Sequence, residues 1–229
     1  MTALVIGHRG APKREVENSL ASFRAAVAAG ADGVELDIHS SADGTLFVHH
    51  DPRIGASPLI SQLTAAQVRA LRLPNGDPVP TLEEALQASG PAIRVYIEVK
   101  ALDPRCDSQL LKAIEAGPNP AGYAVHGFDH RIIRRLGARA PGLRCGVLSS
   151  SYPVHPLNDL ADAGATTLWE DHALIDPPLA DALHGAGMQL IAWTVDEPAE
   201  MKRLLALGVD ALCTNTPDVA RRVVAEARR

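Results

Sequence analysis

Short runs of apolar and β-branched residues alternate along the chain with longer segments whose apolar residues recur every three or four positions. The first pattern predicts buried strands, and the second predicts helices that pack one face against a sheet. The strand-like runs are residues 3–7, 33–39, 93–99, 123–127, 143–148, 166–169, 189–194 and 209–213. The helix-like segments are residues 19–29, 82–88, 108–116, 130–137, 156–163, 178–185, 198–207 and 217–227. Eight strands that alternate with eight helices favour an α/β fold, a single (β/α)8 TIM barrel, over an open doubly wound sheet.

One stretch interrupts this alternation. Residues 51–80 contain scattered Pro, Gly, Asn and Asp around a single helical segment at 64–71. We interpret the stretch as a small insertion after the second strand, within one barrel domain of residues 1–229.

Polar residues interrupt the predicted strands near their carboxyl ends, which is where TIM-barrel enzymes place their active sites. They are His8 and Arg9 after the first strand, Glu35 and Asp37 on the second, and Glu98 and Lys100 on the third. Gly10, Phe128 and Trp193 stand at the ends of the first, fourth and seventh strands. The sequence therefore predicts a polar site at this end of the barrel.

Glu35 and Asp37 share one face of the second strand, because strand side chains alternate in direction. Asp43-Gly44 then predicts a type I′ hairpin turn, whose two central positions need positive φ. This turn would set position 37 opposite position 50 and carry His50 to the two carboxylates. Such a group suits a site that binds a cation and moves protons near neutral pH, as ester cleavage requires. The alternative is a solvated strand face with an incidental histidine.

Glu98 and Lys100 share a face of the third strand with Tyr96. Burying the two charged groups in a barrel costs several kcal/mol each unless they find partners. A bound cation and a substrate anion would be such partners, and a structural Glu98–Lys100 ion pair is the alternative.

Composition narrows the class of protein. The 229 residues are 46% hydrophobic, which is enough for a full core, and the net charge of −5 argues against nucleic acid as a partner. The three cysteines form no C-x-x-C pair, which favours reduced thiols and a cytoplasmic location. The apolar run that opens the chain is too short for a signal peptide, and no window approaches the roughly 18 apolar residues of a membrane span. We therefore expect no stable membrane insertion, and the oligomeric state stays open.

Other aromatic and histidine residues carry less information. Phe128 and Trp193 are either core aromatics or an apolar wall facing substrate, and their place at strand ends in a chain with 3% aromatics favours the wall. The remaining histidines lack H-x-H spacing and are interpreted as surface or hydrogen-bonded loop residues, not metal ligands. They are His39, His49, His126, His130, His155, His172 and His184.

The order of the polar motifs resembles that of the glycerophosphodiester phosphodiesterase family. The motifs are His8-Arg9-Gly10, Glu17-Asn18, Glu35-x-Asp37, Asp43-Gly44 followed by His50-Asp51, Glu98-x-Lys100, Phe128, Trp193-Thr194-Val195 and Thr214-Asn215-x-Pro217. The resemblance covers nearly the whole chain and depends on the order of the motifs, since each alone is common.

The resemblance implies a metal-dependent barrel hydrolase that cleaves glycerophosphodiesters to glycerol 3-phosphate and an alcohol, through attack by the neighbouring glycerol hydroxyl. The implied catalytic acid and base are His8 and His50; the implied ligands of one divalent cation, Mg²⁺ or Ca²⁺, are Glu35, Asp37 and Glu98; and the implied phosphate and substrate contacts are Arg9, Lys100, Phe128, Trp193 and Glu17. These roles make physical sense, because a cation and two basic side chains offset the negative charge that makes a phosphodiester a poor electrophile.

The chain departs from the family pattern at Ser19, Gly127 and Asp196, where threonine, serine and asparagine are common. Asp196 would disfavour anionic head groups if it reached the pocket. Two rival functions remain: a phosphodiesterase of the same fold that acts on lysophospholipids or other phosphodiesters, and a non-catalytic barrel that binds a phosphorylated ligand.

Overall fold

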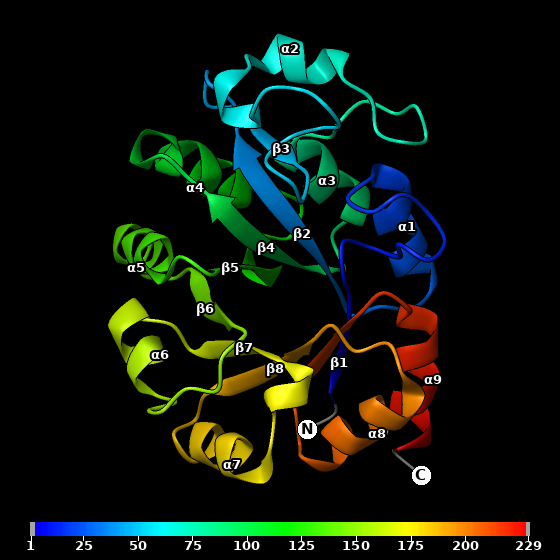
Figure 1. Ribbon diagram of the computed structural model, residues 1–229, viewed down its shortest axis with the longest axis vertical. Coiled ribbons are helices and arrows are strands. Elements are labelled where there is room, and N and C mark those ends of the chain that lie inside the picture. The colour runs from blue at the N-terminus through cyan, green and yellow to red at the C-terminus, as the bar shows by residue number, and fades with distance from the viewer. Residues whose placement is uncertain (1–2, 228–229) are drawn as a thin grey trace.

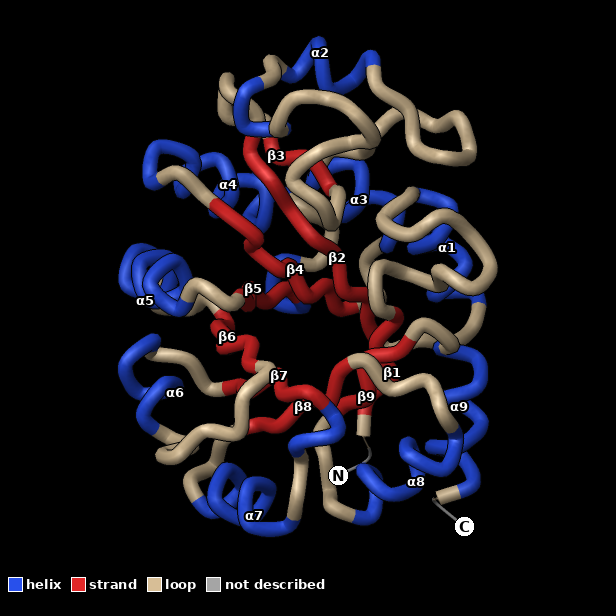
Figure 2. The backbone as a smooth tube through the Cα atoms, in the orientation of Figure 1, coloured by secondary structure: helices blue, strands red, loops and turns tan. Residues whose placement is uncertain are grey.

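A closed ring of parallel strands forms the centre of the molecule. The computed structural model describes residues 3–227, so that Met1, Thr2, Arg228 and Arg229, at the two ends of the predicted domain, lie outside the described residues. The ring contains β1 (Leu4–Gly7), β2 (Gly33–Ser40), β4 (Arg94–Ala101), β5 (Tyr123–Gly127), β6 (Arg144–Ser149), β7 (Thr167–Asp171), β8 (Gln189–Trp193) and β9 (Ala211–Thr214). β1 pairs with both β2 and β9, which closes the barrel (Figure 2).

Helices surround this ring, as Figure 1 shows. They are α1 (Leu20–Ala28), α3 (Leu82–Ser89), α4 (Asp107–Ala116), α5 (His130–Arg139), α6 (Asn158–Ala163), α7 (Pro177–Gly185), α8 (Pro198–Ala206) and α9 (Pro217–Glu226), with short 3-10 helices η2 (Pro104–Cys106), η3 (Pro120–Gly122) and η4 (His172–Leu174). Local signals explain several helix starts: Ser19 caps α1, Thr81 and Glu84 form a capping box at α3, and proline begins α7, α8 and α9. The predicted (β/α)8 barrel is confirmed. None of the helices in residues 3–227 combines the length and the apolar character that a membrane span requires.

The strands separate two apolar clusters of very different size. The large cluster fills the layer between the outer face of the strands and the helices, and includes Val34, Leu36, Ile38, Val95 and Ile97. The small cluster fills the barrel interior and consists of Ile6, Tyr96, Leu148, Trp169, Ile191, Ala211 and Cys213. Alternation along each strand produces this division, because neighbouring residues point to opposite faces.

The hairpin after β2 differs from the predicted one. β3 (Leu46–Val48) pairs antiparallel with β2, with Ile38 opposite Val48. Residues 42–44 form a three-residue loop in which Gly44 has φ 87° and Asp43 does not have positive φ, so the turn is not type I′. Position 37 therefore faces position 49, and the predicted pairing with position 50 is wrong by one residue. The physical reason is that the Asp43 carboxylate accepts hydrogen bonds from Ser41 Oγ and the Ala65 backbone N–H, which stabilise the longer loop.

Residues 51–80 lie between β3 and α3 and contain η1 (Ile60–Gln62) and α2 (Ala65–Ala70). They pack on a third apolar cluster formed by Phe47, Ile54, Ile60, Leu63, Val68, Leu73 and Val79. Figure 1 shows this segment at the top of the molecule, beyond β3. The segment thus stands beside the carboxyl ends of β2 and β4.

Candidate active site

Three buried acidic side chains occupy neighbouring strands inside the barrel. Glu35 and Asp37 come from β2 and Glu98 from β4, and the parallel register places Asp37 beside Glu98 and Glu98 beside His126 of β5. Ligand atoms of Glu35, Glu98 and His126 all lie within 4.8 Å of one another, which is a spacing suited to a metal ion.

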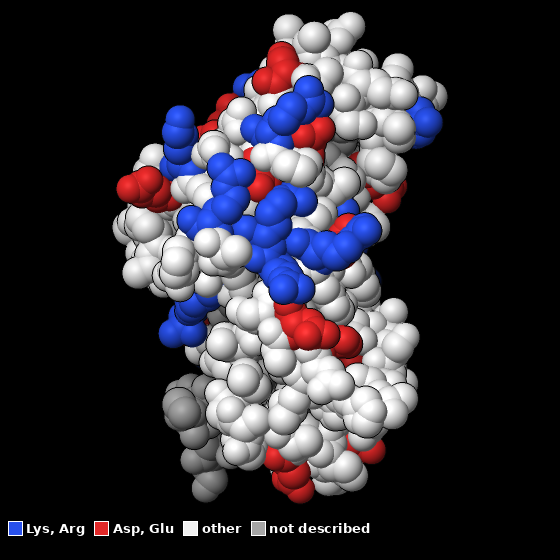
Figure 3. All heavy atoms as spheres, turned by 90° about the vertical axis from the view of Figure 1, so that its left-hand side faces the viewer, with Lys and Arg blue, Asp and Glu red and all other residues white. Residues whose placement is uncertain are grey.

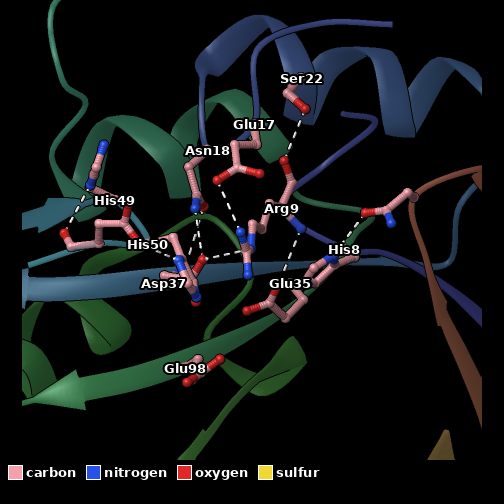
Figure 4. Close-up of polar contacts among 12 residues, drawn as sticks. His8, Arg9, Glu17, Asn18, Ser22, Glu35, Asp37, His49, His50 and Glu98 are labelled. Carbon is pink, nitrogen blue, oxygen red and sulfur yellow. Dashed lines mark hydrogen bonds and ion pairs between the residues drawn. The ribbon is translucent and has the colours of Figure 1, made fainter. Parts of the chain in front are cut away.

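Asp37 is surrounded by positive charge and by a hydrogen-bond donor. Its carboxylate lies 3.0 Å from Lys100 Nζ. It also lies 3.2 Å from Arg9 Nε and accepts a 2.7 Å hydrogen bond from Asn18 Nδ2 (Figure 4). Burial alone would raise the pKa of Asp37, but Lys100 and Arg9, followed by Asn18, lower the pKa to about 2. Asp37 is therefore a fixed negative charge that positions both basic side chains.

Glu35 and Glu98 are in the opposite situation. Burial, followed by repulsion from Asp37, raises the pKa of Glu98 to about 7 and the pKa of Glu35 well above its ordinary value, although Lys100 Nζ lies 2.6 Å from Glu98 Oε1. Glu35 Oε1 is buried and has no hydrogen-bond partner among residues 3–227. The local positive charge is thus too small to ionise both carboxyl groups, and a divalent cation between them would correct this deficit. The residues present fit such an ion.

The His8-Arg9-Gly10 turn holds Arg9 in an unusual backbone conformation. Arg9 has φ 53°, which costs a non-glycine residue about 1 kcal/mol or more. Its N–H donates to Glu35 Oε2 at 3.0 Å, and its carbonyl accepts hydrogen bonds from the Asn18 N–H and Ser22 Oγ. Its guanidinium also pairs with Glu17 at 2.9 Å (Figure 4). These contacts stabilise the strained turn and fix the direction of the Arg9 side chain.

His8 is oriented by a chain of hydrogen bonds. Its Nδ1–H donates to Asn215 Oδ1 at 2.8 Å, and Asn215 Nδ2 donates to Asp196 at 2.8 Å. Because Asn215 Oδ1 only accepts, Nδ1 carries the proton and the lone pair of His8 is on Nε2. Burial, followed by the charge of Arg9, lowers the pKa of His8, which keeps the imidazole neutral at pH 7. Asp196 accepts hydrogen bonds from Thr214 and Asn215, so it supports His8 instead of facing a head group.

His50 lies at the mouth of the barrel, just past the end of β3. Its Nδ1 is 2.8 Å from Asp51 Oδ1, and its carbonyl accepts a 3.0 Å hydrogen bond from His39 Nε2. The neighbouring His49 donates instead to the Asp51 carbonyl (Figure 4). Because β3 ends at Val48, the residues after it are not held in the strand register. His50 therefore still lies at the cavity that Glu35 and Glu98 line, despite the one-residue shift of the hairpin.

A small cavity of about 80 Å³ brings these groups together. Its lining residues are His8, Arg9, Glu35, His50, Glu98, Lys100, His126, Phe128, Leu148, Trp169, Trp193 and Cys213. Phe128 is 50% exposed and meets Trp193 edge to face at 5.9 Å, so the two rings form a wall of the cavity and are not core aromatics. Glu17 does not line the cavity and contacts it through Arg9.

A larger groove of about 960 Å³ continues from the cavity and shares His50 and Lys100 with it. Its other walls come from the insertion, through Leu59 and Ser61, and from α5, through Arg131 and Arg135. Figure 3 shows Lys and Arg side chains gathered on the side of the molecule that carries α4 and α5. The acidic partners Asp107 and Asp129 pair with arginines of α5, so this side is less positive than the number of basic groups suggests.

The structure adds two residues that the motif pattern did not assign. His126 was expected on the surface or in a loop, and this expectation is wrong: it is 2% exposed and lies in the barrel interior. The alternation of Ala124 and His126 on β5, continued by Phe128 just past its end, is the signal that would have found it. Asn18, also buried, donates from Nδ2 to the Asp37 carboxylate and accepts at Oδ1 from the Asp37 backbone N–H. Its φ is positive, at 56°.

The fold and the cavity define a (β/α)8-barrel enzyme. Residues 8–219 match the model of the Glycerophosphoryl diester phosphodiesterase family, and the chain belongs to this family. A glycerophosphodiester phosphodiesterase of Caldanaerobacter subterraneus subsp. tengcongensis is 30% identical over 239 residues, covering 98% of each chain.

Solved structures agree with this assignment. A glycerophosphodiester phosphodiesterase of Parabacteroides distasonis superposes with a TM-score of 0.90 at 25% identity, covering 100% of this chain and 99% of that one. An Oleispira antarctica phosphodiesterase in complex with sn-glycerol-3-phosphate shares the fold, with a TM-score of 0.90 at 21% identity and coverage of 98% and 97%.

Proposed function

We propose that this enzyme hydrolyses glycerophosphodiesters to glycerol 3-phosphate and an alcohol, with His8 and His50 as the proton-transfer pair and one divalent cation as cofactor. The observation that carries the proposal is the cavity, where three imidazoles, those of His8, His50 and His126, surround a space of about 80 Å³ together with two basic side chains and two carboxylates. A phosphodiester needs these groups, because its negative charge must be offset before a nucleophile can attack.

Glu35, Asp37 and Glu98 would hold the cation, and oxygen ligands of this kind suit Mg²⁺ or Ca²⁺. The bound ion supplies positive charge to the phosphate and to its transition state. Arg9 and Lys100, both positioned by Asp37, add two further charges for the non-bridging oxygens.

Within the pair, His8 is proposed as the first base and His50 as the first acid. His8 is neutral and has its Nε2 lone pair free, so it accepts the proton of the glycerol hydroxyl next to the phosphate. That oxygen bonds to phosphorus as the bond to the leaving alcohol breaks, and His50 gives its proton to the leaving oxygen. Asp51, 2.8 Å from His50 Nδ1, fixes the orientation of the His50 ring. Water then opens the cyclic phosphate with the two roles reversed.

The two neighbouring spaces suggest how the substrate is divided. In this proposal the phosphate and the glycerol carbon chain bind at the small cavity, against Phe128 and Trp193, and the leaving alcohol extends into the larger groove. The free, buried state of Cys106, Cys145 and Cys213 is compatible with a cytoplasmic enzyme.

The test is turnover of a panel of glycerophosphodiesters by the purified enzyme, with and without a chelator. His8→Ala and His50→Ala should each lower kcat by at least about a hundredfold, the typical effect of losing a proton-transfer group. His49→Ala is the matched control, since His49 bonds to the Asp51 carbonyl and does not line the cavity, and it should stay within about threefold of the parent. Full activity in excess chelator, or near-normal kcat in either variant, would refute the mechanism.

A further inference from the structure

His126 lies among the carboxylates although the motif pattern gives it no role. It stands directly beside Glu98 in the parallel register of β4 and β5. One of its ring nitrogens belongs to the group of ligand atoms from Glu35, Glu98 and His126 that lie within 4.8 Å of one another. Three strands, β2, β4 and β5, thus each contribute one donor to a common point.

The ring of His126 is held in a fixed plane. It stacks on the indole of Trp169, with ring centroids 4.1 Å apart and an interplanar angle of 4°. Gly146, the register neighbour of His126 on β6, makes room for this indole, because a Cβ at Gly146 would lie 3.1 Å from two indole atoms. Tyr96 in turn packs edge to face against Trp169, with ring centroids 5.3 Å apart. The imidazole therefore has little freedom to turn away from the carboxylates.

His126 also lacks the hydrogen bonds that a structural histidine would have. Its Nδ1 is buried and has no partner among residues 3–227. Leaving a buried polar atom without a hydrogen-bond partner costs about 1–3 kcal/mol of folding free energy. The indole of Trp169, which covers one face of the imidazole, offers no hydrogen bond to offset this cost. His130, four residues later, differs in this respect, since its Nε2 donates to the Leu148 carbonyl at 3.1 Å.

We propose that His126 is a nitrogen ligand of the cation bound by Glu35 and Glu98, so that the site selects a first-row transition ion such as Mn²⁺ over Ca²⁺. Imidazole nitrogen is a ligand of first-row transition ions, whereas Ca²⁺ takes oxygen ligands. Asp37 shares its carboxylate oxygens with Lys100, Arg9 and Asn18, so it offers a cation fewer free lone pairs than Glu35 or Glu98, and a nitrogen ligand from β5 would complete the set. The inference rests on the proposed function only in requiring that the carboxylates bind a divalent cation.

Pulsed electron paramagnetic resonance of Mn²⁺ bound to the chelator-treated enzyme tests the inference without any activity measurement. The parent should show modulation from a directly bonded ¹⁴N nucleus, which ¹⁵N-histidine labelling converts to the ¹⁵N pattern. His126→Gln should remove this modulation, and His130→Ala, the matched control, should retain it. Absence of the nitrogen coupling in the parent overturns the proposal whatever the variants do.

Calorimetric titration of the same proteins with Mn²⁺ and Ca²⁺ gives the second readout. The parent should bind Mn²⁺ at least about tenfold more tightly than Ca²⁺, and His126→Gln should weaken Mn²⁺ by at least about tenfold while leaving Ca²⁺ within about threefold. Equal affinities in the parent, or equal weakening of both ions, overturn the proposal. Cation binding that depends on Glu35 and Glu98 but not on His126 would refute this inference alone, whereas no binding of any divalent cation would refute the cofactor of the proposed function as well.

Discussion

Glu98→Gln is the most informative single substitution, because the proposed function and a purely structural ion pair make opposite predictions for it. Glu98 is buried, lies 2.6 Å from Lys100 Nζ and has its pKa raised to about 7 by burial and by Asp37. The amide has the same shape but neither the charge nor the affinity for a cation. If Glu98 is a ligand, the variant should lose the stabilisation that a cation gives to the folded protein.

The size of that loss follows from linkage. A cation at 100 times its Kd stabilises the folded state by about 2.7 kcal/mol. Unfolding a chain of 229 residues has an entropy of about 0.5 kcal/mol/K, so the cation should raise Tm by about 5–6 °C. In Glu98→Gln the same cation concentration should raise Tm by less than about 1 °C.

Without cation, the variant should be at least as stable as the parent. Removing one carboxyl group relieves the burial cost and the repulsion from Asp37, and Lys100 keeps its 3.0 Å contact with Asp37. The assay is thermal unfolding followed by fluorescence, in chelator and across a cation series, with Glu83→Gln on the exposed side of α3 as control. A full cation shift in Glu98→Gln would show that Glu98 is not a ligand. A fall in Tm of more than about 6 °C in chelator would show that the Glu98–Lys100 pair is structural.

Three further outcomes are expected. Asn215→Ala should lower kcat about tenfold with KM unchanged in steady-state kinetics, because it frees the Nδ1 proton of His8, and an unchanged kcat would contradict the orienting role. Glu170 is buried and its pKa is raised to about 7, so the parent should lose stability as pH rises from about 4.5 to 7, where only the unfolded chain ionises this group. In urea unfolding, Glu170→Gln should therefore gain about 2 kcal/mol relative to the parent between pH 5 and pH 8, and a gain that does not depend on pH would reject the buried-acid account. The glycerophosphodiesters of choline, ethanolamine and glycerol should be cleaved with kcat/KM values within about tenfold of one another. Bis(p-nitrophenyl) phosphate, which lacks the glycerol hydroxyl, should react far more slowly. Comparable kcat/KM values for the two classes of substrate would mean that water attacks the phosphorus directly.

Periodicity predicted the architecture because each strand and helix of a barrel repeats the same local pattern. Valine, isoleucine and leucine at alternate positions identify the strands, and the same alternation puts Glu35, Asp37 and Glu98 on one interior surface. The hairpin register was not predictable from Asp43-Gly44, since the hydrogen bond from Ala65 to Asp43 comes from 22 residues further along the chain.

Other features of the site depend on contacts between distant segments. The support of His8 by Asn215 joins residues 207 positions apart, and the role of Asp196 as their anchor appears only in three dimensions. The interior place of His126 could have been inferred from the phase of β5, because Phe128 two residues later lies at the mouth. Its stacking on Trp169 could not, since it also requires the missing side chain of Gly146.

The unequal packing on the two faces of the strands has a consequence for how this enzyme can evolve. Most of the buried apolar residues lie between strands and helices, while the interior cluster contains only seven buried residues within the described chain. Substitutions around the cavity therefore remove little of the packing on which folding depends, and mutational tolerance should be highest where selection for new substrates acts. Libraries directed at Phe128, Leu148 and Trp193 should retain a large folded fraction, whereas equal numbers of changes at the outward-facing Leu36, Val95 and Ile97 should mostly give aggregated protein.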